Sequence, residues 1–130
     1  MGTPRHILVA LAITAGCHRV AAHPRDVDLR DTSRVVGTYS VTRGPDSVAQ
    51  VRLVEVTYGP SGVSPPHSHS CPVIGYIVEG ALRSRVDDEP ERVYHIGETF
   101  YERANSRHVV SANANERSGT KLLAVFVCPH

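Results

Sequence analysis

The sequence predicts an all-β protein whose strands form a sandwich or a barrel. Short segments rich in Val, Ile, Tyr and Thr recur from residue 35 onward, and clusters of Gly, Pro, Asp and Asn separate them. Beyond the N-terminal segment, no stretch keeps apolar residues at helical spacing. Many short strands at such intervals are typical of two-sheet folds. A chain of 130 residues is long enough for one domain with one modest core.

The expected strands follow one another along the chain with little between them. Val48–Tyr58 alternates apolar and polar residues most clearly, as a strand with one buried face should. Turns are expected where Gly, Pro, Asp and Asn gather, at residues 59–62, 79–80, 87–90 and 113–119. In chain order the expected strands are Val35–Val41, Val48–Tyr58, Val73–Val78, Ala81–Val86, Arg92–Ile96, Thr99–Glu102, His108–Ser111 and Lys121–Val127.

The N-terminus has the composition of a targeting segment. Arg5 precedes an apolar run over residues 7–15, and the small residues at 20–22 would permit cleavage before His23. A positive start, a short apolar core and a small-residue cleavage site are the layout of a signal peptide. We therefore expect residues 1–22 to be removed, which predicts a secreted or periplasmic protein.

Two alternatives to this N-terminus stay open, and a polar arm follows it. Residues 14–17 resemble a bacterial lipoprotein box, in which Cys17 would carry a lipid anchor. The other alternative is a short N-terminal helix of a cytosolic protein. After the leader, residues 23–34 look like a polar arm, and the folded domain is expected at 35–130.

His67-Ser68-His69 is the most informative motif of the chain. Residues two apart on an extended segment point to the same side, so both imidazoles share one face. Two neutral imidazoles on one face form half of a site for a first-row transition metal. A lone His-x-His in a loop is more often surface chemistry, but Gly97, a strand, a turn and His108 follow downstream. Together the two segments predict a metal site at His67, His69 and His108.

These two segments resemble the motifs of the cupin superfamily, and in particular its small single-domain, RmlC-like members. His67, His69 and Gly80 match the first motif, and Gly97 and His108 match the second in spacing. The resemblance covers about residues 50–127. It implies a double-stranded β-helix, the cupin jelly-roll barrel, with a metal at the histidines. It also implies a homodimer, because the N-terminal arm of a cupin often packs on a neighbouring subunit.

The chain departs from the cupin motifs in two places. Val73 stands where the first motif has a metal-binding Glu, and Arg103 and Asn105 replace the Pro and Gly of the second motif's turn. We expect Val73 to point toward the metal and to leave the site with an extra positive charge, which favours an anionic or chelating ligand. Val73→Glu should then tighten Mn²⁺ binding. The turn should be less rigid.

Several other side chains are assigned by their place in the expected strands and turns. Glu102 precedes the turn to His108 and is the candidate acid/base group, with an ordinary rim Glu as the alternative. Glu98 is expected to complete a turn and His95 to lie on a strand surface. Tyr76 either lines the cavity or faces solvent. Cys71 and Cys128 would be able to pair in an exported protein, although Cys71 is equally suited to the mouth of the site or to a small buried position.

Composition limits the function classes. The net charge is +1 with scattered basic residues, so nothing indicates a nucleic-acid partner, and no apolar run reaches the length of a membrane span. Three histidines suit one divalent Fe, Mn, Zn, Ni or Cu ion and leave open positions for a small-molecule ligand. The sequence predicts an exported metal-dependent cupin, an oxygenase or oxidoreductase acting on a small chelating or anionic substrate. The alternative is a non-catalytic metal or small-ligand binding module.

Overall fold

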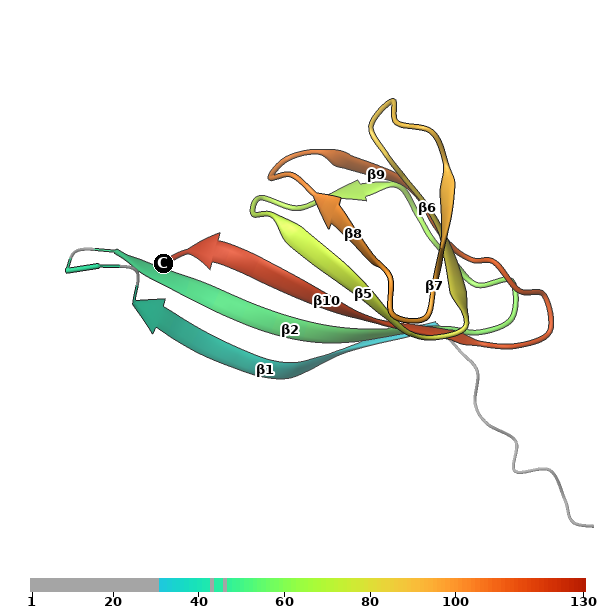
Figure 1. Ribbon diagram of the computed structural model, residues 1–130, viewed down its shortest axis with the longest axis horizontal. Helices are drawn as coiled ribbons and strands as arrows, with labels where there is room; N and C mark the ends of the chain where they lie inside the picture. Colours follow the sequence, from blue (N-terminus) through green and yellow to red (C-terminus); the bar gives the residue numbers. More distant parts are fainter. Residues whose placement is uncertain (1–30, 43, 46) are drawn as a thin grey trace, which may run out of the picture.

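The computed structural model describes residues 31–42, 44–45 and 47–130, which form two antiparallel β-sheets facing each other (Figure 1). No helix occurs in these ranges, and so none there is long and apolar enough to cross a membrane. The strands are β1 (Thr32–Thr42), β2 (Val48–Tyr58), β3 (Val63–Ser64), β4 (His67–Ser68), β5 (Val73–Glu79), β6 (Ala81–Val86), β7 (Arg92–His95), β8 (Thr99–Glu102), β9 (Arg107–Asn113) and β10 (Thr120–Pro129).

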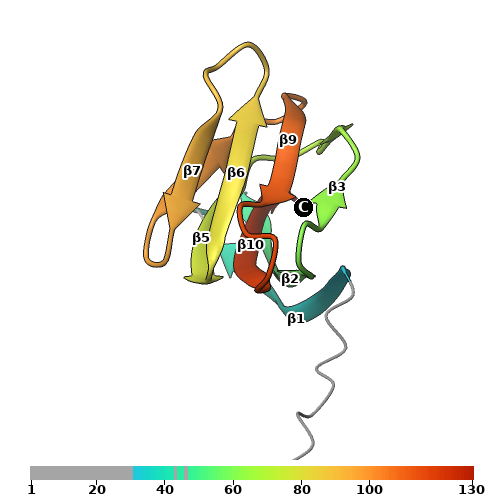
Figure 2. The same cartoon turned by 90° about the vertical axis from the view of Figure 1, so that its right-hand side faces the viewer.

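The two sheets have the orders β1-β2-β10-β5-β8 and β3-β9-β6-β7, with β4 also paired to β9. Figure 2 shows β7, β6 and β9 side by side, in front of β5 and β10 of the other sheet. Non-sequential neighbours such as β2 and β10 mean that the chain crosses between the sheets, as it does in a jelly roll. The all-β sandwich expected from the sequence is therefore confirmed.

The expected strands all appear with small differences at their ends, and two further strands are present. Two short strands, β3 and β4, were not expected, because Pro65 and Pro66 interrupt this stretch and proline cannot donate to a ladder. β1 begins at Thr32, inside the range expected to be a polar arm. Before it, the carboxylate of Asp31 accepts hydrogen bonds from the backbone of Gly59 at 2.9 Å and of Val63 at 3.2 Å. The expected signal peptide and Cys17 lie outside the described residues.

The core lies between the sheets and is built from alternate residues of the strands. Its most buried members are Ile77 on β5 and Leu82 on β6, one from each sheet. Gly75 is packed directly beneath Phe100, since a Cβ at this position would lie 2.2 Å from the ring. Only glycine leaves room for that aromatic ring. Around Ile77 and Leu82 the core contains Tyr58, Cys71, Val73, Phe100, Leu122, Ala124 and Phe126.

Both motif glycines occupy backbone positions that disfavour a side chain. Gly80, in the β5–β6 turn, has a φ of +71°, and Gly97, in the β7–β8 turn, has a φ of +85°. L-residues rarely adopt this left-handed region, whereas glycine enters it without a steric cost. At Gly80 a Cβ would also lie 2.6 Å from the carbonyl oxygen of Gly119. The motif spacing thus reflects two sharp turns that fix the ends of the strands.

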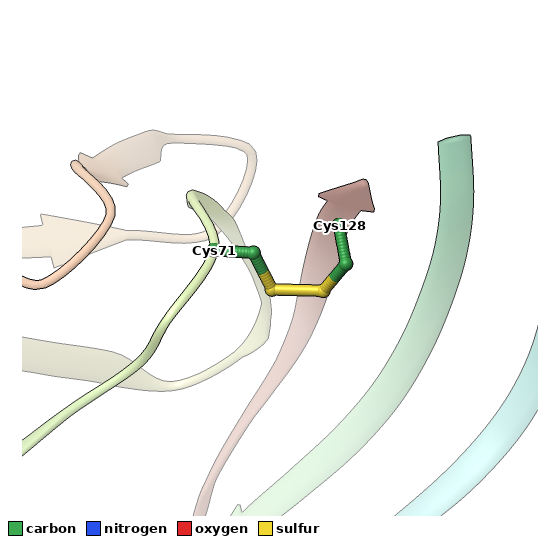
Figure 3. Close-up of a disulfide and its surroundings, with 2 residues drawn as sticks. All are labelled: Cys71 and Cys128. Atoms are coloured by element: carbon green, nitrogen blue, oxygen red, sulfur yellow. A yellow bond between two sulfur atoms is a disulfide. The ribbon is translucent and has the colours of Figure 1, made fainter. Parts of the chain in front are cut away.

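Cys71 and Cys128 form a disulfide (Figure 3). Cys71 lies in the loop just before β5, and Cys128 is near the end of β10. The bond closes a loop of 57 residues in sequence separation, with Cα atoms 5.0 Å apart. Because Cys71 follows His69 by two residues, the bond ties the end of the His-x-His segment to β10, the middle strand of the β1-β2-β10-β5-β8 sheet. Of the arrangements that the sequence allowed for these cysteines, the structure has the paired one.

Candidate metal centre

The three predicted histidines meet at one place between the sheets. His67 on β4 is the direct partner of His108 on β9 in the antiparallel ladder, and their ring centroids are 5.2 Å apart. The ring of His69 lies 4.9 Å from that of His67 and contacts the edge of Phe126. The structure therefore brings together the side chains that the two motifs supply, one motif from each side of the site.

Glu102, the last residue of β8, places a carboxylate beside these imidazoles. It is only 4% exposed. Its Oε1 lies 3.1 Å from His108 Nδ1, and its Oε2 lies 4.0 Å from His69 Nε2. In the β5–β8 ladder Glu102 is the direct partner of Val73, the residue at the motif Glu position. The carboxylate that the first motif lacks is thus supplied by the neighbouring strand.

This pairing corrects one expectation and confirms another. A site without a carboxylate, and with the extra positive charge that follows, was expected from Val73; that is wrong, because Glu102 brings the negative charge. The expected direction of Val73 is confirmed, since its side chain is 1% exposed and lines the same cavity as His67 and His69. The sequence shows that Glu102 precedes the His108 turn, but not that β8 pairs with β5.

Three groups are close enough together to share one ion. The ligand atoms of His67, His69 and Glu102 all lie within 4.8 Å of one another. Oε2 of Glu102 is buried and has no hydrogen-bond partner within the part of the chain that the structure describes. A buried carboxylate oxygen without a donor costs free energy, and native structures rarely keep one unless something binds there. Two imidazoles and a carboxylate are ligands of Mn, Fe, Zn, Ni and Cu, so the donor set fits a divalent transition metal.

The two histidines of the first motif are prepared for binding a cation. His67 Nδ1 lies 2.8 Å from the carbonyl oxygen of Pro65, so Nδ1 donates its proton there and Nε2 keeps its lone pair. Burial lowers the pKa of His69, and the nearby charge of Glu102 opposes this only in part. The lowered pKa of His69 favours the neutral imidazole, which is the form that binds a metal.

His108 is fixed by contacts at both ring nitrogens. It is 2% exposed, its Nε2 lies 2.8 Å from Ser84 Oγ, and its Nδ1 faces Glu102. The tautomer that satisfies both contacts carries its proton on Nδ1, accepts from the Ser84 hydroxyl and points an N–H at the carboxylate. In this arrangement His108 orients Glu102. Direct ligation of a metal by His108 stays a prediction of the sequence.

A β-bulge determines which residues of β9 face the site. Val110 pairs with Arg85, but His108 pairs with Val86, so Val109 has no partner on β6. One extra residue reverses the alternation of side chains beyond it. His108 and Ser111, three positions apart, therefore both line the cavity, although a regular strand would put them on opposite faces.

The turn before β9 is held by hydrogen bonds, not by the expected Pro and Gly. Asn105 adopts a φ of +62°, in place of the glycine, and its N–H donates to the carbonyl oxygen of His69 at 2.7 Å. Arg103 donates to Asp87 at 3.1 Å, and the backbone N–H of Arg107 donates to the same carboxylate at 2.7 Å. The Arg107 bond is the main reason why the pKa of Asp87 is lowered. These contacts hold the turn where the motif would have Pro and Gly.

The site opens into a small cavity of about 110 Å³. Its polar lining comprises the metal-centre residues and three hydroxyl groups, those of Tyr58, Ser64 and Ser111. Sequence reasoning did not identify these hydroxyls. Tyr58 shares its face of β2 with Val56, which gave a usable signal, but the direction of Ser111 depends on the bulge. The rest of the wall is apolar and consists of Val56, Val73, Phe100, Leu122, Ala124 and Phe126.

The remaining assigned residues lie away from the cavity. Tyr76 is 43% exposed and faces solvent, which decides between its two expected positions. His95 is exposed on β7, as predicted. Glu98 accepts a hydrogen bond from the backbone N–H of His95 and closes the β7–β8 turn, which confirms its structural role.

With this geometry described, comparison with known proteins identifies the family. The model of the Cupin domain matches residues 54–126, more than half of the chain. The chain is a cupin. The matched range includes both histidine motifs, Cys71 and Glu102. No curated protein sequence matches this cupin.

Solved structures have the same fold at low sequence identity. An RmlC-like cupin from Methanocaldococcus jannaschii has a TM-score of 0.58 at 17% identity, covering 83% of this chain and 87% of that one. An RmlC-like cupin from Shewanella frigidimarina has a TM-score of 0.52 at 19% identity, covering 70% and 84%. A structure of oxalate oxidase has a TM-score of 0.54 at 25% identity, covering 58% of this chain and 41% of the other. The small RmlC-like cupins are matched over most of their length, and the protein is a small single-domain cupin of that kind.

Proposed function

We propose that this cupin binds one divalent transition metal through His67, His69 and Glu102, beside His108, and acts on a small chelating or anionic molecule as a metal-dependent oxidoreductase. One observation carries the metal site: a carboxylate oxygen of Glu102 and a ring nitrogen of each histidine lie within 4.8 Å of one another, and the buried Oε2 of Glu102 has no hydrogen-bond partner among the described residues. The three residues arrive from β4, the loop after it and β8, so only the folded chain forms the site.

The chemistry divides between the ion and the chain. When bound, a transition metal supplies Lewis acidity, open coordination positions and, for Fe, Mn or Cu, redox activity. Glu102 offsets one of its two charges and leaves a net positive site that attracts an anion. His108 keeps Glu102 in place through its Nδ1, and Ser84 keeps His108 in place. The apolar wall lowers the local dielectric and strengthens these interactions.

The proposed reaction class is supported by a solved structure of the same fold. Oxalate oxidase, which by its name oxidises a small chelating anion, has this fold at 25% identity. A cavity of about 110 Å³ suits a molecule of this scale. If Glu102 binds the metal, the acid/base role expected for it from the sequence falls to another group or to bound water. Aerobic turnover of small chelating acids by the metal-loaded protein tests the reaction class.

The alternative is a non-catalytic metal or small-ligand binding module. Among the described residues that line the cavity, the only imidazole and carboxylate side chains are those of the three histidines and Glu102, and all four belong to the candidate metal centre. No separate proton acceptor of that kind is left for a reaction step. Tight binding of a small acid without any turnover, under each reconstituted metal, would favour this alternative.

Export from the cytoplasm is part of the same proposal. Disulfides persist in oxidising compartments, so the Cys71–Cys128 bond supports a secreted or periplasmic protein. Intact-mass measurement of protein from its native host should give a chain starting near His23 or carrying a lipid on Cys17. A full-length product starting at Met1 would contradict both versions.

A homodimer is the expected assembly. The outer face of the β1-β2-β10-β5-β8 sheet exposes several large apolar side chains. Single exposed apolar residues are normal in soluble proteins, but several on one face indicate an interaction surface. Sedimentation should give a dimer, and Tyr101→Lys together with Tyr76→Lys should give a monomer of unchanged fold. A monomeric wild-type protein at micromolar concentration would contradict this proposal. The side chains in question include Tyr39, Ile74, Tyr76, Val78 and Tyr101.

Elemental analysis of purified variants tests the metal centre. We expect about one ion per chain in the wild-type protein and in the control His95→Ala, whose imidazole is exposed, and none in His67→Ala or Glu102→Ala. His108→Ala separates two roles. Loss of metal binding would show that His108 is a ligand, and weakened binding would show that it positions Glu102. Full metal content in His67→Ala would overturn the site.

A further inference from the structure

Three hydroxyl groups form a cluster in the cavity wall, apart from the metal centre. The hydroxyl of Tyr58 lies 2.7 Å from Ser64 Oγ and 2.8 Å from Ser111 Oγ. Tyr58 is 3% exposed and Ser111 is 6% exposed, while Ser64 is half-buried. The three residues come from β2, β3 and β9, so the cluster connects both sheets, and all three line the cavity.

A count of protons shows that this cluster has a donor to spare. Each hydroxyl carries one proton, so the cluster has three protons but makes two internal hydrogen bonds. Among the described residues, neither serine oxygen has another partner. Whichever way the hydroxyls rotate, at least one O–H remains for something else. When the spare O–H is on Tyr58 or Ser111 it is a buried donor without a partner, which is costly, so the cluster offers a place for an acceptor in the cavity.

The hydroxyl cluster lies along the strands from the metal centre. His108 and Ser111 are three residues apart on β9, roughly 10 Å at the rise of a strand. His67 and Ser64 stand in the same relation on the facing segment, since Ser64 pairs with Ser111 and His67 with His108. The other described side chains that line the cavity are apolar. No Lys or Arg occurs among the described lining residues, so a negative charge at the hydroxyl end would be uncompensated.

We infer that the Tyr58–Ser64–Ser111 cluster binds a neutral oxygen acceptor of the ligand, such as a ketone, ester or amide carbonyl, while the ligand's anionic end lies at the metal centre. This inference rests on the proposed metal site and specifies its ligand class: a short monocarboxylate with a distal carbonyl group. A dicarboxylate that spans both places would bury its second charge without a partner.

Calorimetric titration of the Co²⁺-loaded protein tests this ligand class with three acids of equal chain length. They are 4-oxopentanoate, with a distal carbonyl, pentanoate, without one, and pentanedioate, with a second carboxylate. We expect 4-oxopentanoate to bind roughly fivefold more tightly than pentanoate, the typical effect of one net hydrogen bond. Pentanedioate should bind more weakly than 4-oxopentanoate. Equal affinity for 4-oxopentanoate and pentanoate would overturn the inference.

Variants of the cluster show whether the hydroxyls cause this preference. Any single removal leaves at least one free O–H, so Tyr58→Phe alone should keep much of the preference. The triple variant Tyr58→Phe/Ser64→Ala/Ser111→Ala has no hydroxyl and should lose it, while its Co²⁺ affinity stays unchanged. Tyr39→Phe, on the outer sheet face, is the matched control and should behave like the wild-type protein.

Two outcomes separate this inference from the metal proposal. If the triple variant binds Co²⁺ and still prefers 4-oxopentanoate, the hydroxyl cluster is not the recognition site and the inference is wrong. If the wild-type protein binds no Co²⁺, the metal proposal fails, and this inference fails with it. Should the triple variant not fold, Tyr58→Phe/Ser64→Ala/Ser111→Cys replaces the last hydroxyl with a weakly donating thiol and should reduce the preference at least twofold; an unchanged preference would contradict the inference.

Discussion

The two motif-bearing segments of this cupin, residues 67–80 and 97–113, hold their functional side chains by different means. The first is fixed covalently, because the Cys71–Cys128 disulfide ties it to β10. The second is fixed by hydrogen bonds. Asp87 accepts two of them from Arg103 and Arg107 in the turn at residues 103–107, and another joins Ser84 to His108. Both reach the same result, which is that the site side chains of the two segments face one cavity.

The two segments also divide the metal ligands differently from the cupin motifs. The first offers two imidazoles but an aliphatic side chain at the third position, whereas the second offers a carboxylate that its motif does not contain. Side chains of paired residues on antiparallel strands are about 5 Å apart and point to the same face. A carboxylate can therefore move from Val73's position to Glu102's and still reach the same space. The site is defined in space and not by one strand.

Removing the disulfide should reduce the free energy of unfolding more than any other change, because the first segment then loses its covalent tie to β10. For a closed loop of 57 residues, the chain-entropy estimate is about 4 kcal/mol of unfolding free energy. We expect Cys71→Ser/Cys128→Ser to lose up to that amount in chemical denaturation. Metal affinity should fall as well, because His69 lies two residues from Cys71. Asp87→Asn, which loosens only the second segment, is the comparison variant and should cost clearly less. Equal losses would mean that the crosslink adds nothing special.

Moving the carboxylate back to its motif position tests the comparison most directly. Glu102→Ala should weaken Mn²⁺ binding by roughly 100-fold, since a ligand and its charge are lost. Val73→Glu/Glu102→Ala should restore most of this affinity. Val73→Glu alone should also tighten Mn²⁺, as the sequence predicts, but should destabilise the metal-free protein because two carboxylates then face each other. Mn²⁺ titrations at one pH measure all four proteins. A double variant no better than Glu102→Ala would show that the paired positions are not equivalent.

The smallest expected effect concerns pH, and it differs between the segments. The pKa of His69 is lowered by burial, so on acidification the unfolded chain takes up this proton first. Its contribution to stability is present above the ordinary histidine pKa of about 6.5 and is lost as pH falls below it. The pKa of Asp87 is lowered from 3.8, so its contribution to stability is fully present above 3.8. That contribution is lost as the pH falls through the lowered pKa of the folded protein.

Thermal unfolding of the metal-free protein from pH 8 to pH 3 measures both contributions. His69→Asn should flatten the decline that begins near pH 6.5, and Asp87→Asn should flatten only the decline in the acid range. If both variants change the same pH range, the two segments are not independent in their response.

The sequence was sufficient for the fold and for most of the metal centre, because both depend on local patterns. Alternation located the strands, and the histidine spacing located three side chains that do meet. The carboxylate was assigned a different role, because its place depends on the pairing of β5 with β8, which is not local. The contacts that hold the turn at Arg103 and Asn105 are likewise not local, since Asp87 lies 16 residues from Arg103. Sequence patterns show which residues face one way, but not which strand comes to lie beside them.

Because Val109 has no partner on β6, a deletion in β9 would change the site in a way that no substitution could. Because one residue more or less reverses the facing of everything beyond it, deletion of Val109 would leave every remaining amino acid in place and yet turn Ser111 away from the cavity. A relative one residue shorter here would differ in ligand chemistry while appearing almost identical in composition. When related chains are aligned, a single gap between His108 and Ser111 therefore carries more functional information than several substitutions on the outer sheet face.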